Sequence, residues 1–377
     1  MTSSPASPSA AEVRPRSLVP ETLVIEGVSA ETIFLPDRSI DTIGQLLDTL
    51  WRRRQRRLLA FALRVTSGFP RLSIETDFEE AIAAYTSLPQ SHRRALMEHP
   101  PFRVWLTHMG RIDLVEAAES ANQQVVFKKR LEEFCRLQKE ILPRLNQPNG
   151  SQPYILQRYD VDPLIAEVAP PSFVFENLDA KRTRDASNPY TLGFLAEVLQ
   201  AALKRIERVW PEMVDVFPSF VKIIIHLPDI ESRSCSAQRF AGAIMLSASD
   251  DSLLAMEESL IHECGHQILY CVMELDPLIR RDAKGSFVLP WSGSERDAYG
   301  YFHATYIYLI LALFFERALG RESSEDETVR QRLVTILHGL ERALADFETA
   351  ECFTTAGRMF FHRMGAVGRE AIGRNPY

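Results

Sequence analysis

The sequence predicts a mainly α-helical protein with a small β-sheet, an α+β fold. Long segments in both halves of the chain repeat apolar residues at helical spacing, and two short apolar runs, residues 220–227 and 240–247, are typical of strands. The chain has 377 residues, 46% of them hydrophobic, so it can bury a full core. The expected helices are residues 39–65, 78–87, 90–99, 114–142, 190–209, 252–275, 294–320 and 328–348.

Three regions are expected along the chain. Residues 1–20 are rich in Ser, Pro and Ala and lack the apolar core of a secretion signal, which is typical of a disordered leader. Residues 21–150 are predicted to form a helical N-terminal region, a candidate for peptide recognition. A cluster of Asn, Pro and Gly at residues 146–153 breaks the helical pattern. Residues 151–377 are predicted to form a metal-binding catalytic domain.

The charge balance argues against nucleic acid as a partner. The net charge is −7, from 50 acidic and 43 basic residues, whereas nucleic-acid-binding domains usually carry a basic excess. One basic cluster, from Arg52 to Arg57, departs from this balance. We expect it to be the solvated face of a helix; the alternative is a docking surface for an acidic partner or peptide.

The cysteines and the apolar segments predict a cytoplasmic protein with no membrane partner. The five cysteines are odd in number and form no CxxC pair, so we expect free thiols in a reducing compartment. The most apolar run, residues 306–315, is too short to span a bilayer and is followed by Glu316 and Arg317. We expect this run to lie in a buried helix.

The strongest chemical signal is the motif His262-Glu263-Cys264-Gly265-His266, within a predicted helix. Two imidazoles four residues apart lie on one helical face, one turn apart, and can reach one metal ion. Glu263 projects beside that face, where a general base or a partner of a ligand belongs. Gly265 permits close approach by a neighbour or a ligand, and Cys264 is expected to be a packed thiol. The alternative is two histidines buried in a core helix without a metal.

A third ligand is expected from the next predicted helix, which offers His303 and Glu295. At about 100° per residue, Arg296 lies only about 20° and Tyr299 about 40° from His303 around the axis, whereas Glu295 is about 80° away. These angles favour His303 and predict a stripe in which Arg296 holds a carboxylate that also touches the metal. The alternative role for Arg296 is a salt bridge to Asp297 or Glu295.

Several stretches in this part of the chain resemble one family, the HExxH-motif proteins encoded beside ribosomally synthesised and post-translationally modified peptides. The resemblance covers residues 240–316, about a fifth of the chain. In that family the residue before the arginine is often proline, and here it is Glu295, which further favours His303 as the ligand. The stretches are Gly-Ala-Ile-Met-Leu-Ser at 242–247, Leu-Ile-His-Glu-Cys-Gly-His at 260–266, Leu-Asp-Pro-Leu at 275–278, Pro-Trp at 290–291, and Arg296 followed by His303.

The resemblance implies an Fe(II)- and 2-oxoglutarate-dependent oxygenase that hydroxylates the β-carbon of a residue. The substrate would be a ribosomally made precursor peptide or a carrier-bound amino acid. The implied iron ligands are His262, His266 and His303, with Glu263 beside the metal. Arg296 would bind 2-oxoglutarate, with Tyr299 beside it.

Two other functions fit the sequence. The first is a zinc metallopeptidase with a zincin-like site, in which Glu263 is the general base and His303 or Glu295 completes the shell. Three neutral histidines suit zinc as well as iron, since oxygenases more often use two histidines and a carboxylate. The second is a non-catalytic, metal-stabilised protein that recruits a leader peptide through the cluster from Arg52 to Arg57.

Overall fold

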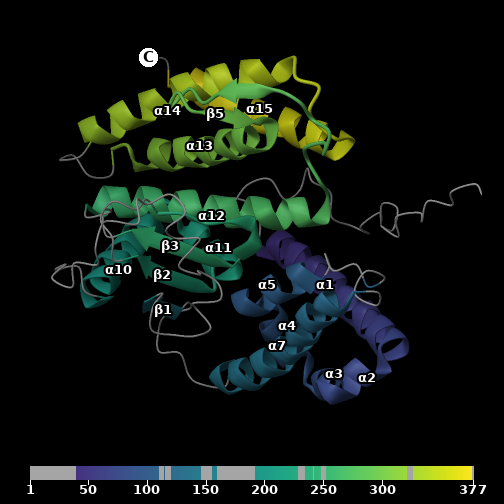
Figure 1. The fold of residues 1–377 in the computed structure, drawn as a ribbon. Coiled ribbons are helices and arrows are strands. Elements are labelled where there is room, and N and C mark those ends of the chain that lie inside the picture. The colour runs from purple at the N-terminus through teal and green to yellow at the C-terminus, as the bar shows by residue number, and fades with distance from the viewer. Residues whose placement is uncertain are drawn as a thin grey trace, which may run out of the picture.

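A computed structural model describes residues 40–109, 114, 120–145, 155–158, 192–227, 234–240, 242–247, 252–320 and 326–375. The fold is mainly helical with a small sheet, as predicted. The expected leader at residues 1–20 and the helix-breaking cluster at residues 146–153 lie outside the described residues. In Figure 1 helix α12 runs through the middle of the molecule, with the later helices on one side of it and the sheet on the other.

The N-terminal helices surround an aromatic core of their own. Rings of Phe61, Phe78, Trp105, Phe127 and Phe134 meet at centroid distances of 4.9–6.3 Å, mostly edge to face or tilted. Such contacts account for the close packing of short helices here. The helices are α1 (Ile40–Gly68), α2 (Pro70–Glu75), α3 (Phe78–Ser87), α4 (Gln90–Glu98), α5 (Pro100–Met109) and α7 (Ala121–Leu145).

The sheet consists of three parallel strands in the order β1 (Ile155–Arg158), β2 (Ile223–Leu227) and β3 (Ala243–Ser247). Every residue of β2 and β3 is buried, as expected for a parallel sheet covered on both faces. Both predicted strands are confirmed, with shorter bounds. Helices α10 (Leu192–Val209) and α11 (Pro211–Phe220) precede β2, and α10 packs on α12.

Helix α12 (Leu253–Leu275) carries the histidine motif and packs on α13 (Ala298–Ala318). Ser252 caps α12, its side chain accepting from the Ala255 N–H at 3.1 Å. A Cβ at Gly265 would lie 2.8 Å from Cδ1 of Ile307 on α13, so this glycine lets the two helices approach closely. Cys264 is buried, as expected. Helices α14 (Asp326–Glu348) and α15 (Thr355–Arg374) complete the layer outside α13.

The predicted start of α13 is wrong. Residues Glu295–Asp297 form strand β5, which pairs antiparallel with β4 (Ser286–Val288). The helix begins only at Ala298, because the Asp297 side chain caps it by accepting from the Gly300 N–H at 2.7 Å. Glu295 and Arg296 are therefore strand residues.

Among the described helices, α13 is the one whose length and hydropathy would allow it to cross a membrane. Its most apolar window has a mean hydropathy of 1.4, and 78% of that window is buried inside the molecule. The apolarity of α13 is therefore explained by its place between α12 and α14, in accord with the buried helix expected there.

The basic cluster of α1 lies partly in solvent and partly in an internal contact. Arg54 is 4% exposed and donates twice to the Glu274 carboxylate of α12, at 2.9 and 2.5 Å, while Arg53 donates to the Leu275 carbonyl at 2.6 Å. Arg103 of α5 lies 3.7 Å from the same carboxylate. The expected solvated face is confirmed for Arg52, Arg56 and Arg57, which are exposed. It is wrong for Arg53 and Arg54, which join the N-terminal helices to the end of α12.

Candidate metal centre

Three histidines meet between α12 and α13. The rings of His262 and His266, one turn apart on α12, have centroids 5.0 Å apart. The ring of His303, from α13, lies 5.5 Å from that of His266 at an angle of 22°. The structure therefore brings the predicted third residue to the face of α12 that carries the motif.

The closest contact joins the Nδ1 atoms of His266 and His303, which are 3.3 Å apart. Two ligands of a tetrahedral ion with metal–nitrogen distances of about 2.0–2.1 Å are separated by about 3.3–3.4 Å. The same spacing suits a hydrogen bond between one protonated and one bare Nδ1 atom. In either tautomer Nε2 of His303 is buried and has no hydrogen bond among the described residues.

All three imidazoles are held neutral, which is the form that binds metals. Burial, with a smaller effect of Arg332, lowers the pKa of His262 to about 4. Burial lowers the pKa of His303 to about 3. The pKa of His266 falls well below its ordinary value because of burial and of its two histidine neighbours.

The predicted ligands are not arranged around a single ion position in the structure. Among the described residues, no group of three or more His, Cys, Asp and Glu side chains is arranged to hold one ion. His266 and His303 have the spacing of a ligand pair, but His262 stands beside them, with 31% of its side chain exposed. The three-histidine centre stays a prediction.

Two tyrosines enclose His303. The ring of Tyr299 lies 4.4 Å from that of His303, and the ring of Tyr270, from α12, lies 5.2 Å away on a tilted approach. The Tyr299 hydroxyl donates to Gln238 Oε1 at 3.3 Å, which ties the start of α13 to the segment before β3. Burial, with the nearby Asp297, raises the pKa of Tyr299 to about 12, so this phenol stays protonated.

A group of residues outside the predicted metal ligands covers another flank of His262. Tyr308 meets the His262 ring edge to face at 6.3 Å, and Trp291 stacks on Tyr308 at 3.9 Å. Arg332 of α14 reaches the same flank and donates through Nε to both oxygens of Glu258, at 3.1 and 3.0 Å. These residues are separated by up to 74 positions in the sequence, so no local pattern points to them.

Glu263 lies beside the histidines, as predicted. Its side chain is almost fully buried, and Oε1 is 4.0 Å from Nε2 of His262. It also faces the segment before β3, because burial and then the Glu263 charge raise the pKa of Cys235 to about 12. A buried carboxylate at this distance from an imidazole can accept a proton from a molecule held between them.

The predicted helical stripe of Arg296, Tyr299 and His303 is not formed. Arg296 is exposed on β5, and its Nη1 donates to the Glu295 carbonyl at 2.9 Å. Glu295 is likewise exposed on that strand. The angles between these residues assumed a continuous helix, and the Asp297 cap breaks it. Tyr299 remains beside His303.

No protein-family model matches this sequence, and no curated protein matches it either.

Proposed function

We propose that this protein is a metal-dependent enzyme whose ion is held by His262, His266 and His303. The observation that carries the proposal is the pair of neutral imidazoles of His266 and His303, on different helices, with Nδ1 atoms 3.3 Å apart. A bound ion would satisfy buried nitrogens that otherwise cost about 1–3 kcal/mol each when left without a partner. His262, one turn away, is the third donor.

Within that class we propose an Fe(II)- and 2-oxoglutarate-dependent hydroxylase of a ribosomally made peptide or a carrier-bound amino acid. The resemblance of the motif and its surroundings supports this chemistry. Iron and its cosubstrate would supply the oxidising power for attack on an unactivated C–H bond. The chain would position the substrate and keep water out, with Tyr270 and Tyr299 enclosing His303. Arg296 would bind the cosubstrate carboxylate after leaving the Glu295 carbonyl.

The second candidate is a zinc metallopeptidase, favoured by the position of Glu263. Its buried carboxylate, 4.0 Å from His262, is suited to take a proton from an attacking water. The packing of α12 on α13 would then be the zincin-like arrangement of the motif helix against a second long helix.

Metal loading separates these proposals. The protein is purified without oxygen, titrated with Fe(II) or Zn(II) by calorimetry, and assayed for succinate formation from 2-oxoglutarate with a precursor peptide. We expect one ion per chain and turnover with iron, and His303→Ala should abolish both while Glu295→Ala should not. Peptide cleavage with zinc, and no succinate with iron, would establish the second candidate instead. Failure to bind either ion would overturn the metal centre itself.

A further inference from the structure

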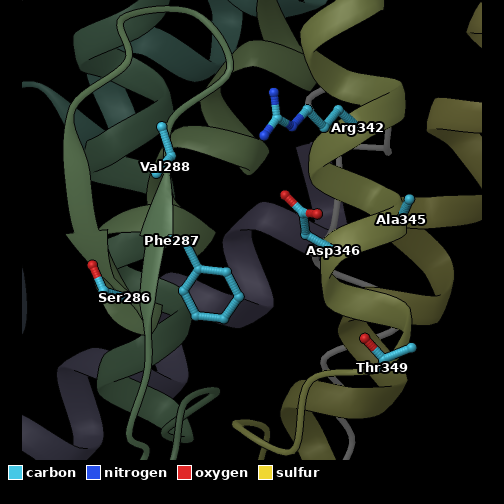
Figure 2. Close-up of a pocket in the computed structure, with 7 residues that line it drawn as sticks. All are labelled: Ser286, Phe287, Val288, Arg342, Ala345, Asp346 and Thr349. Carbon is cyan, nitrogen blue, oxygen red and sulfur yellow. The ribbon is translucent and has the colours of Figure 1, made fainter.

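A second site lies on the other side of α13 from the histidines. Tyr301 and His303 are two residues apart, so their side chains leave the helix about 200° apart. The ring of Tyr301 stacks on Phe287 of β4 at 4.8 Å, and its hydroxyl donates to Asp346 of α14 at 2.5 Å. Here a cavity of about 380 Å³ opens between β4 and α14 (Figure 2). This volume lies within the range of about 300–1,000 Å³ that is usual for ligand sites.

Strand β4 presents an open edge to this cavity. Phe287 is a hydrogen-bonded position of the β4–β5 ladder, because the next bond of the hairpin runs from the Leu289 N–H to the Ser294 carbonyl, at 2.9 Å and two residues on. The N–H and C=O groups of Ser286 and Val288 therefore point away from β5. No other strand within the described residues pairs with β4. An edge of this kind is a template for a further strand.

Two charged side chains line the cavity, Arg342 and Asp346. Arg342 extends from α14 toward β4 beside Asp346 (Figure 2), and it is exposed, with no ion pair or hydrogen bond to any described residue. Asp346 already accepts from Tyr301. Of these two groups the Arg342 guanidinium is the one without a hydrogen bond to a described residue, and its planar donors match a carboxylate.

We propose that this cavity binds an extended peptide segment, which adds a strand to the open edge of β4 and places an acidic side chain against Arg342. Backbone bonds to Ser286 and Val288 would give affinity for any extended chain, and Arg342 would select the acidic one. The exposed side chain of Val288, at 45%, offers an apolar contact to an alternate residue of the peptide. The site goes beyond the metal centre and does not depend on it.

Fluorescence polarisation with labelled pentapeptides tests the proposal on the full chain. The probe has the sequence Val-Glu-Val-Glu-Val with blocked ends, and the comparison peptide carries Lys in place of Glu. We expect the acidic peptide to bind roughly tenfold or more tightly than the basic one, a difference of about 1.4 kcal/mol. Arg342→Glu should reverse that preference, whereas Arg330→Glu, on the same helix but outside the cavity, should not.

The backbone part of the proposal has its own test. Val288→Pro removes an N–H that the β4–β5 ladder does not use, so it should weaken the acidic peptide while circular dichroism stays unchanged. N-methylation of alternate residues of the peptide should abolish binding in one phase of alternation and leave it intact in the other. The proposal would be overturned if neither N-methylation pattern changed the affinity of the acidic peptide, or if Arg342→Glu left that affinity unchanged.

Two further outcomes are decisive. In the first, free glutamate competes with the labelled peptide. If free glutamate binds as tightly as the acidic peptide, the peptide backbone adds no affinity, and the site is a carboxylate pocket; that result would overturn strand addition. His303→Ala should bind the acidic peptide as the unmodified protein does, because α13 separates the two sites. Loss of the metal centre and loss of peptide docking are thus distinguished in one set of proteins.

Discussion

Helix α12 carries two buried polar clusters that are satisfied in opposite ways. At its end the Glu274 carboxylate is bound by Arg54 and approached by Arg103, so the charges are paired. In its middle, His266 meets His303 nitrogen to nitrogen, and Nε2 of His303 has no hydrogen bond within the described structure. In a polar cluster that only joins parts of the fold, every polar atom can find its hydrogen-bond partner within the protein. A binding site keeps polar atoms open for its ligand.

The largest expected effect is on the paired cluster. Glu274→Ala leaves the Arg54 and Arg103 guanidinium groups buried without their carboxylate, which should lower the free energy of unfolding by about 3–5 kcal/mol. Glu348→Ala, which removes an exposed partner of Arg369, is the control and should cost at most about 1 kcal/mol. Urea denaturation measures both. Equal effects of the two substitutions would show that the buried network does not hold the N-terminal helices to α12.

At the histidine cluster the expected effect is a stabilisation of the protein by bound metal. An ion present at a hundredfold excess over its Kd should raise the free energy of unfolding by about 2.7 kcal/mol. His303→Leu should remove that gain and leave the metal-free protein as stable as before or more so, because an unsatisfied polar atom is lost. Unfolding is followed with Zn(II) or with a chelator, and Glu295→Ala serves as control. An undiminished gain from metal in His303→Leu would exclude His303 as a ligand.

The spacing of the two helices that carry the histidines can be tested separately. Gly265→Ala forces a Cβ against Ile307 and should destabilise the protein by about 1–3 kcal/mol. Ile307→Val removes the crowded atom, so the double variant should be more stable than the sum of the single effects predicts. Gly44→Ala, in a helix with no atom within 4 Å of the new Cβ, should be stabilising or neutral. Additive behaviour of Gly265 and Ile307 in urea unfolding would contradict the contact.

The paired cluster also predicts a pH dependence of the free energy of unfolding. Burial alone would raise the pKa of Glu274, but Arg54, followed by Arg103 and Arg57, lowers it to about 2. Because the folded pKa lies below the unfolded value of 4.5, the stabilisation is complete above about pH 4.5 and is lost as the pH falls toward 2.

One carboxyl can change the free energy of unfolding by at most about 1.4 kcal/mol per pH unit. The difference between the unmodified protein and Glu274→Gln, measured by urea denaturation at a series of pH values, should narrow across this window. A constant difference would refute the assignment of this titration to Glu274.

The sequence predicts most of the helical elements because their apolar periodicity is local. It misses α15, because the glycines of this segment lower its helix propensity. Close packing requires two of them: Gly357 lies against the Leu278 backbone and Gly368 against Leu344. It also misses the β4–β5 hairpin. Those strands are three residues long and depend on packing against α13, which no short window of sequence reports.

The candidate site divides in the same way. The spacing of the motif on one helix is enough to predict that His262, Glu263 and His266 lie close together. The approach of His303 was expected from its buried place in an apolar helix. Arg296 was misplaced because a capping aspartate was read as part of the helix, and the flank formed by Tyr308 and Arg332 arises only when α13 and α14 pack together.

The ring of Trp291 packs against α14 at Gly339, where any larger residue would collide with it. Its Nε1 donates to the Ile336 carbonyl at 3.2 Å, and a Cβ at Gly339 would come within 2.1 Å of that same nitrogen. The two positions are therefore coupled sterically. A side chain at 339 would force the indole of Trp291 to move, and with it the ring that stacks on Tyr308. The glycine at 339 thus sets the shape of the flank of His262 without contributing a side chain of its own.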